Sequence, residues 1–147
     1  MLSSETKQVG RYEYKVTKFP TRKGLEVFEK LLEVVGEPLA LFMRDGGEET
    51  GQEELDDAEA LSKALGLFAK NVQGGKLFWF ADQFMPHSSV TIDGTEKPLK
   101  PIFELHFSGE YGELMGWLLF CLEVNYKSFF DGLGGVKDQA AGLTQTQ

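Results

Sequence analysis

The sequence is poor in reactive side chains: its 147 residues include one cysteine and two histidines. A lone Cys121 excludes an internal disulfide, and its apolar neighbours predict a small buried hydrophobe in a reducing compartment. The sequence also lacks the roughly 20 consecutive apolar residues that a membrane-spanning helix requires, and it has no hydrophobic signal region near Met1. We therefore expect a protein that stays in the cytoplasm where it is made and binds no membrane.

Basic residues are few relative to acidic ones, with 15 against 23 and a formal net charge of -8. A negative protein is repelled by phosphate backbones, so nucleic acid is not an expected partner. The charge is also unevenly distributed. Residues 1–30 hold seven basic and four acidic groups, whereas residues 31–60 hold one basic and ten acidic groups. We therefore expect the first 30 residues to form a positively charged region and the next 30 a negatively charged one.

The apolar content is sufficient for a core, at 41% hydrophobic residues including 12 phenylalanines. Apolar periodicity predicts a strand at 12–17, helices at 22–35, 55–72, 77–84 and about 109–130, and a hairpin near 88–101 that can pair with the first strand. The predicted fold is therefore mainly α (α+β). It is a single domain of about four to five helices with a small antiparallel β element.

We expect residues 9–135 to form this domain, between a disordered N-terminus at 1–8 and a disordered C-terminal tail at 136–147. Gly36 stands where a C-terminal cap of the helix at 22–35 belongs. Residues 45–54 contain five carboxylates, three glycines and no apolar residue, so nothing there drives packing. They predict an acidic loop.

The candidates for acid-base catalysis or metal binding are His106, Glu110 and Glu113, because offsets of four and seven residues place them on one face of a helix. A metal-dependent enzyme is therefore one alternative. Acidic residues near the start of a helix also meet the positive end of its macrodipole, which accounts for the same pattern. We accordingly expect no catalytic residue, no metal and no cofactor.

The helix at about 109–130 is apolar on more than one face, which is typical either of a central core helix or of a helix that keeps one face for a partner. Asn125 lies within its apolar stripe, and a polar amide there must find a hydrogen-bond partner inside or outside the chain. The candidate partner-binding residues are Trp117, Leu118, Asn125, Tyr126, Phe129 and Phe130.

Three stretches of the sequence carry a family resemblance: Leu105-His106-Phe107-Ser108-Gly109, then the run from Leu122 to Phe130, and the strand at 12–17 followed by Pro20 and a leucine-rich helix. Together they resemble the tail assembly chaperones of long-tailed bacteriophages or prophages. That family has a basic residue after the glycine, where this chain has Glu110.

The resemblance implies a protein of the bacterial host cytoplasm that is absent from the mature virion. It also implies stoichiometric binding to the tape measure protein before the tail tube protein polymerises around it. Self-association is left open. A second alternative is a phage-encoded protein that binds a host factor, with the acidic segment 48–59 imitating nucleic acid.

Overall fold

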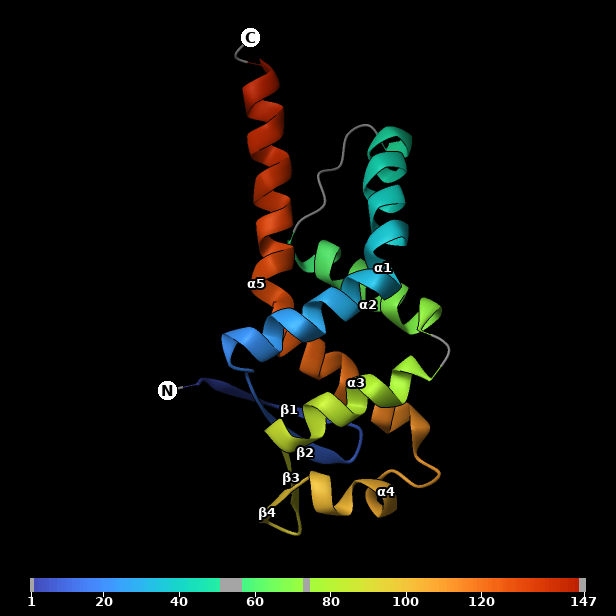
Figure 1. Ribbon diagram of the computed structural model, residues 1–147, viewed down its shortest axis with the longest axis vertical. Coiled ribbons are helices and arrows are strands. Elements are labelled where there is room, and N and C mark those ends of the chain that lie inside the picture. The colour runs from blue at the N-terminus through green and yellow to red at the C-terminus, as the bar shows by residue number, and fades with distance from the viewer. Residues whose placement is uncertain (1, 51–56, 73–74, 146–147) are drawn as a thin grey trace.

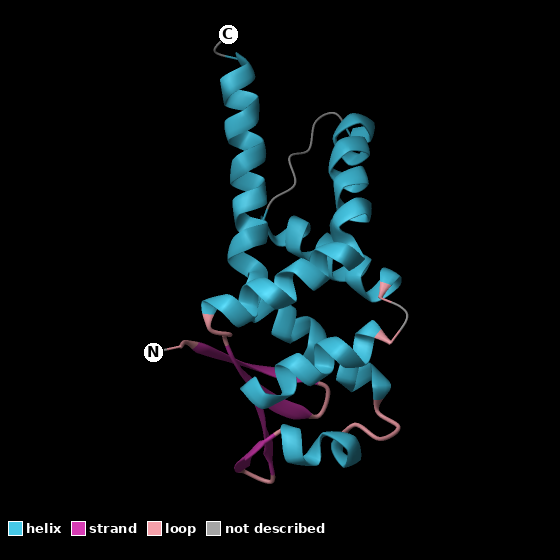
Figure 2. Cartoon of the chain, in the orientation of Figure 1, coloured by secondary structure: helices cyan, strands magenta, loops and turns pink. Residues whose placement is uncertain are grey.

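The computed structural model describes residues 2–50, 57–72 and 75–145, with side chains described in 2–37, 62–72 and 75–129. Within these described ranges, five α-helices pack with one four-stranded antiparallel sheet. Figures 1 and 2 show the strands gathered at the lower end of the molecule, with most of the helical mass above and beside them. The predicted α+β fold, mainly helical with a small β element, is confirmed.

The sheet has the order β1-β2-β3-β4, formed by Ser4–Val9, Tyr12–Thr17, Ser88–Ile92 and Thr95–Pro98. Alternation along β2 buries Tyr14 and Val16 and exposes Lys15, as the period-two pattern predicts. Strand β3 pairs with β2 so that Val90 lies opposite Tyr14. The predicted hairpin near 88–101 and its pairing with the first predicted strand are both confirmed.

The predicted disordered N-terminus at 1–8 is wrong from Ser4 to Gln8, because Ser4–Val9 form the edge strand β1. This segment shows no apolar alternation, because every residue except Val9 is exposed. Its order comes from the backbone ladder with β2, which continues to the hydrogen bond from Lys18 N to Ser3 O at 2.9 Å. Backbone pairing of this kind leaves no hydrophobic signal in a sequence.

The helices are α1 at Thr21–Thr50, α2 at Asp57–Asn71, α3 at Lys76–Phe84, α4 at Phe103–His106 and α5 at Tyr111–Gln145. Two short 3-10 helices, η1 at Met85–His87 and η2 at Lys100–Ile102, flank the β3–β4 hairpin. Helix α5 supplies much of the core, with Trp117, Leu118 and Cys121 all fully buried. At Gly116 an added Cβ would lie 2.8 Å from Val9 Cγ1, so any other residue would require Val9 or the helix to shift.

Three predicted boundaries are wrong. The helix predicted at 22–35 does not end at Gly36 but continues to Thr50, so residues 45–50 of the predicted acidic loop are helical. The tail predicted to be disordered at 136–147 is helical as far as Gln145. A glycine inside a helix costs only about 1 kcal/mol relative to alanine, which neighbouring helix formers offset. Helix α1 bends part-way along its length (Figure 1), as expected of a helix that contains Pro38. Residues 51–54 and 146–147 lie outside the described residues.

Candidate functional site: an apolar groove

An apolar groove of about 300 Å³ lies between the start of α1 and the middle of α5, and we call it the α1–α5 groove. Figure 1 shows the blue start of α1 lying across α5. Its walls come from the β2–α1 connection, the first two turns of α1 and residues 125–129 of α5. They comprise Lys18, Phe19, Pro20, Thr21, Gly24, Leu25, Phe28, Asn125, Tyr126 and Phe129.

Three hydrogen bonds hold the walls of the groove in place. Tyr126 Oη donates to Gly24 O at 2.9 Å, and burial raises the pKa of this phenol, so it remains a protonated donor. The amide of Asn125 accepts from Phe19 N at 2.9 Å and donates to Cys121 O at 3.0 Å. The hydrogen-bond partners of this polar side chain in an apolar stripe therefore lie within the chain.

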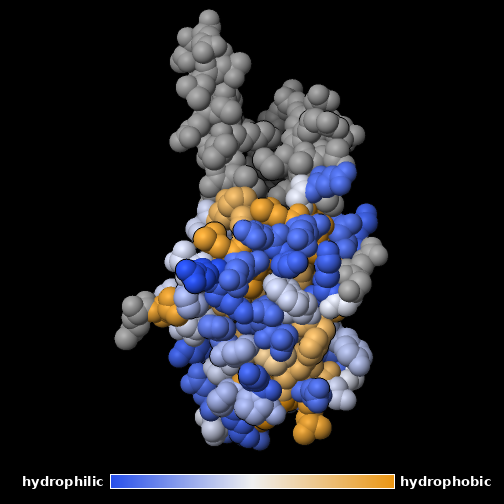
Figure 3. Space-filling view, in the orientation of Figure 1, coloured by the Kyte–Doolittle hydropathy of each residue, from blue (hydrophilic) through white to orange (hydrophobic). Residues whose placement is uncertain are grey.

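Large apolar side chains around the groove are exposed. The ring centroid of Phe28 lies 4.6 Å from that of Phe129 and 5.4 Å from that of Tyr126, so aromatic side chains of the two walls pack against each other. Leu25 is 58% exposed, Leu32 39% and Phe129 36%. Figure 3 shows apolar side chains interrupting an otherwise largely hydrophilic face of the molecule. Contiguous exposed apolar surface of this kind marks an interaction site more often than single exposed residues do.

The six candidate partner-binding residues do not form one surface. It brings Asn125, Tyr126 and Phe129 together in the groove. Trp117 and Leu118 are fully buried, and Trp117 Nε1 donates to Ser88 Oγ at 3.1 Å, so both serve the core and offer a partner no surface. The side chain of Phe130 lies outside the described residues.

Sequence reasoning missed the α1 wall of the groove. The helical spacing of Leu25, Phe28, Leu31, Leu32 and Val35 predicts one apolar face. The structure buries Leu31 and Val35 of this face together with Val27 and Val34, whereas Leu25 and Leu32 are exposed. Within the described residues, the side of α1 that carries Leu25 and Leu32 is therefore only partly covered.

A buried polar cluster connects the sheet to α4 and α5. Tyr14 Oη lies 2.8 Å from His106 Nε2 and donates to Glu113 Oε2 at 2.5 Å. The predicted single helical face for His106, Glu110 and Glu113 is wrong, because Gly109 with φ of 73° separates α4 from α5. Glu110 instead forms an ion pair with Arg11 at 2.9 Å. Among the described residues, no group of three histidine, cysteine or acidic side chains is arranged to hold a metal ion.

The cluster predicts a specific pH dependence of stability. Burial lowers the pKa of His106 below its ordinary value of 6.5, Arg11 lowers it further, and Glu113 partly opposes the shift. The folded state thus favours neutral imidazole. Its stabilising contribution is complete above the unfolded pKa of about 6.5 and is lost as the pH falls through the lower folded pKa.

We therefore expect the stability difference between the wild type and His106→Gln to shrink as the pH is lowered from about 7.5 to about 5, by at most about 1.4 kcal/mol per pH unit. Denaturant unfolding at each pH measures this difference. Both proteins retain His87, whose pKa is also lowered by burial, so its contribution cancels. A difference that stays constant with pH would contradict the expectation.

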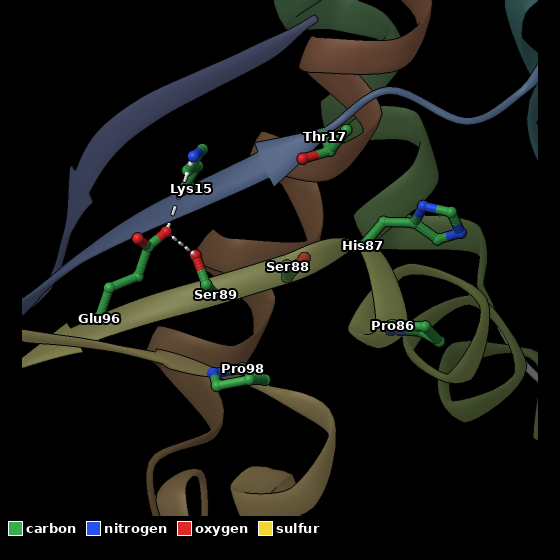
Figure 4. Close-up of a pocket in the computed structure, with 8 residues that line it drawn as sticks. All are labelled: Lys15, Thr17, Pro86, His87, Ser88, Ser89, Glu96 and Pro98. Atoms are coloured by element: carbon green, nitrogen blue, oxygen red, sulfur yellow. Dashed lines mark hydrogen bonds and ion pairs between the residues drawn. The ribbon is translucent and has the colours of Figure 1, made fainter. Parts of the chain in front are cut away.

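A second pocket, of about 490 Å³, lies beside the outward-facing side chains of β2 and β3 (Figure 4). Its acidic group is already paired, because Glu96 Oε1 accepts from Ser89 Oγ at 2.7 Å and lies 3.8 Å from Lys15 Nζ. Figure 4 shows His87 at the other end of the pocket, away from this pair. The lining of this pocket is thus more polar than that of the α1–α5 groove, and its acidic group is engaged within the chain.

The sequence profile of the phage tail assembly chaperone protein family, TAC, matches residues 10–137. The chain belongs to this family. The predicted resemblance is thus confirmed, and the chaperone has a role in phage tail assembly. The matched segment contains both walls of the α1–α5 groove.

The family is one of assembly chaperones and not of enzymes. Comparison of the chaperone with curated proteins and with solved structures gave no match. In the described ranges of the chain, no helix has the length and apolar character needed to cross a membrane.

Proposed function

We propose that the chain binds the phage tape measure protein through the α1–α5 groove, and keeps it competent for assembly until the tail tube protein polymerises around it. One observation carries the proposal: a member of a tail assembly chaperone family has an apolar groove with exposed leucine and phenylalanine side chains at its rim. Binding would be stoichiometric and would involve no chemical turnover. The complex would form in the host cytoplasm, and the chaperone would be left out of the finished virion.

The shape and the apolar lining of the groove are suited to binding a helical segment of another protein. An amphipathic helix can lay its apolar face into a hydrophobic groove, with anchor residues spaced three or four positions apart. The groove lies between two helices and is walled mainly by apolar groups. A net charge of -8 would also help to keep a complex with an apolar client in solution.

Co-expression with the tape measure protein encoded by the same phage tests this function. We expect the two proteins to co-purify in a fixed ratio, and the soluble fraction of the tape measure protein to increase when the chain is present. Size-exclusion chromatography with light scattering measures the ratio. If the tape measure protein has the same solubility with and without the chain, and none co-purifies, the proposed function is wrong.

A further inference from the structure

Three basic residues lie at or just before the start of α1. Lys18 lines the α1–α5 groove, whereas Arg22 and Lys23 lie in the adjoining first turn of α1 and do not line it. That turn contains no acidic residue. The N-terminus of a helix carries a partial positive charge that aspartate or glutamate usually offsets, so basic side chains here add to the positive potential.

Two of these basic residues have no ion-pair partner among the described residues. Several other basic side chains have glutamate partners: Lys7 pairs with Glu123, Arg11 with Glu110, Lys15 with Glu96, and both Lys30 and Lys76 with Glu33. Lys18 and Arg22 form no ion pair with any described residue, and Lys23 donates to the neutral amide of Gln83. Although the protein has a net charge of -8, Lys18 thus stands at its apolar groove with no ion-pair partner in the described part of the chain.

Acidic residues follow the basic ones along α1. Glu26 and Glu29 are exposed, and Glu29 follows Leu25 by one turn. Glu29 forms no ion pair with a described residue, whereas Glu33 is paired with two lysines. The exposed charges therefore change from basic at Lys18 and Arg22, before and at the start of α1, to acidic at Glu26 and Glu29.

From this charge pattern we propose that the groove binds an amphipathic helix of the client polypeptide whose apolar face fills it and whose acidic end lies at Lys18 and Arg22. The inference rests on the proposed function and adds the chemistry and direction of the bound segment. Charges at the rim of an interface contribute little affinity individually but select orientation and partner. Salt should therefore weaken the preference for an acidic end more than it weakens apolar binding.

The test uses the full chain and three synthetic amphipathic peptides with the same leucine and phenylalanine face. One peptide carries glutamates in its terminal turn, one glutamines and one lysines at the same positions. At low salt we expect the wild type to bind the glutamate peptide about threefold to tenfold more tightly than the glutamine peptide. Fluorescence anisotropy gives the three Kd values.

Charge reversal provides the matched comparison. In the variant K18E/R22E we expect the preference to invert, with the lysine peptide bound most tightly. The control K97E/K100E changes the net charge equally at two exposed lysines that do not line the groove, and it should retain the wild-type preference. The proposal is overturned if wild type binds none of the peptides, if K18E/R22E leaves the preference unchanged, or if the control alters it equally.

Failure of this inference is distinguishable from failure of the proposed function. If the tape measure protein co-purifies equally well with wild type and K18E/R22E at low salt, the function stands and the acidic anchor is wrong. If the peptides show the expected preference but the tape measure protein never binds, the groove chemistry stands and the client has been misidentified.

Discussion

Replacing Trp117 with alanine is expected to lower the free energy of unfolding by about 3–5 kcal/mol, the usual cost of truncating a large buried aromatic side chain. Trp117 is fully buried, and its ring packs against Phe103 and Phe107 at centroid distances of 5.9 and 5.6 Å. Truncation would also remove the hydrogen bond that Trp117 Nε1 donates to Ser88 Oγ at 3.1 Å. Denaturant or thermal unfolding followed by circular dichroism measures the effect.

Tyr111→Ala is the matched control for Trp117→Ala, because this aromatic residue begins the same helix and is 74% exposed. Surface substitutions usually change stability by less than about 0.5 kcal/mol. We expect the control to unfold close to the wild type. If Trp117→Ala unfolds at the same denaturant concentration as Tyr111→Ala, the role of Trp117 as the centre of the core is wrong.

The double variant L25A/F129A is expected to weaken binding of the tape measure protein at least tenfold, equivalent to about 1.4 kcal/mol. The two side chains face the groove from opposite walls and are both partly exposed, so they are available as apolar anchors. Neither change adds a charge, so the electrostatics at Lys18 and Arg22 are preserved. Titration of purified protein with tape measure segments measures the loss.

The control for the groove is Leu105→Ala, which removes an apolar side chain that is 87% exposed and does not line the groove. It should bind the tape measure protein as the wild type does. Unfolding curves show whether L25A/F129A is still folded, as we expect from its exposed positions. Equal binding by a folded L25A/F129A would place the client elsewhere on the surface.

Apolar periodicity predicted most of the architecture because packed elements must present one face to the core. Strand β2, the hairpin and helices α2 and α3 all followed from it. Strand β1 was not predictable in this way, since an edge strand whose side chains are mostly exposed is held mainly by backbone hydrogen bonds. The ends of α1 and α5 were missed because Gly36 and the glycines at 132, 134 and 135 indicated helix ends, whereas both helices continue through them.

The candidate site was only half predictable. On α5 the residues Trp117, Leu118, Tyr126 and Phe129 share apolar character, and the sequence does not distinguish the buried side of such a helix from the side left partly open. Asn125 was the more useful signal, because an amide in an apolar stripe indicated a special position. On α1 the apolar face is only partly covered, and only the fold shows which of its residues are buried.

The walls of the α1–α5 groove come from opposite ends of the chain. Gly24 and Tyr126, which the hydrogen bond at 2.9 Å joins, are separated by 102 positions. An unfolded chain would hold these segments far apart, so a ligand of the groove can recognise the native state alone. Occupancy is then thermodynamically linked to folding: a client present at 100 times its Kd would stabilise the chain by about 2.7 kcal/mol. As more of the chaperone is bound to its client, its resistance to denaturation would increase.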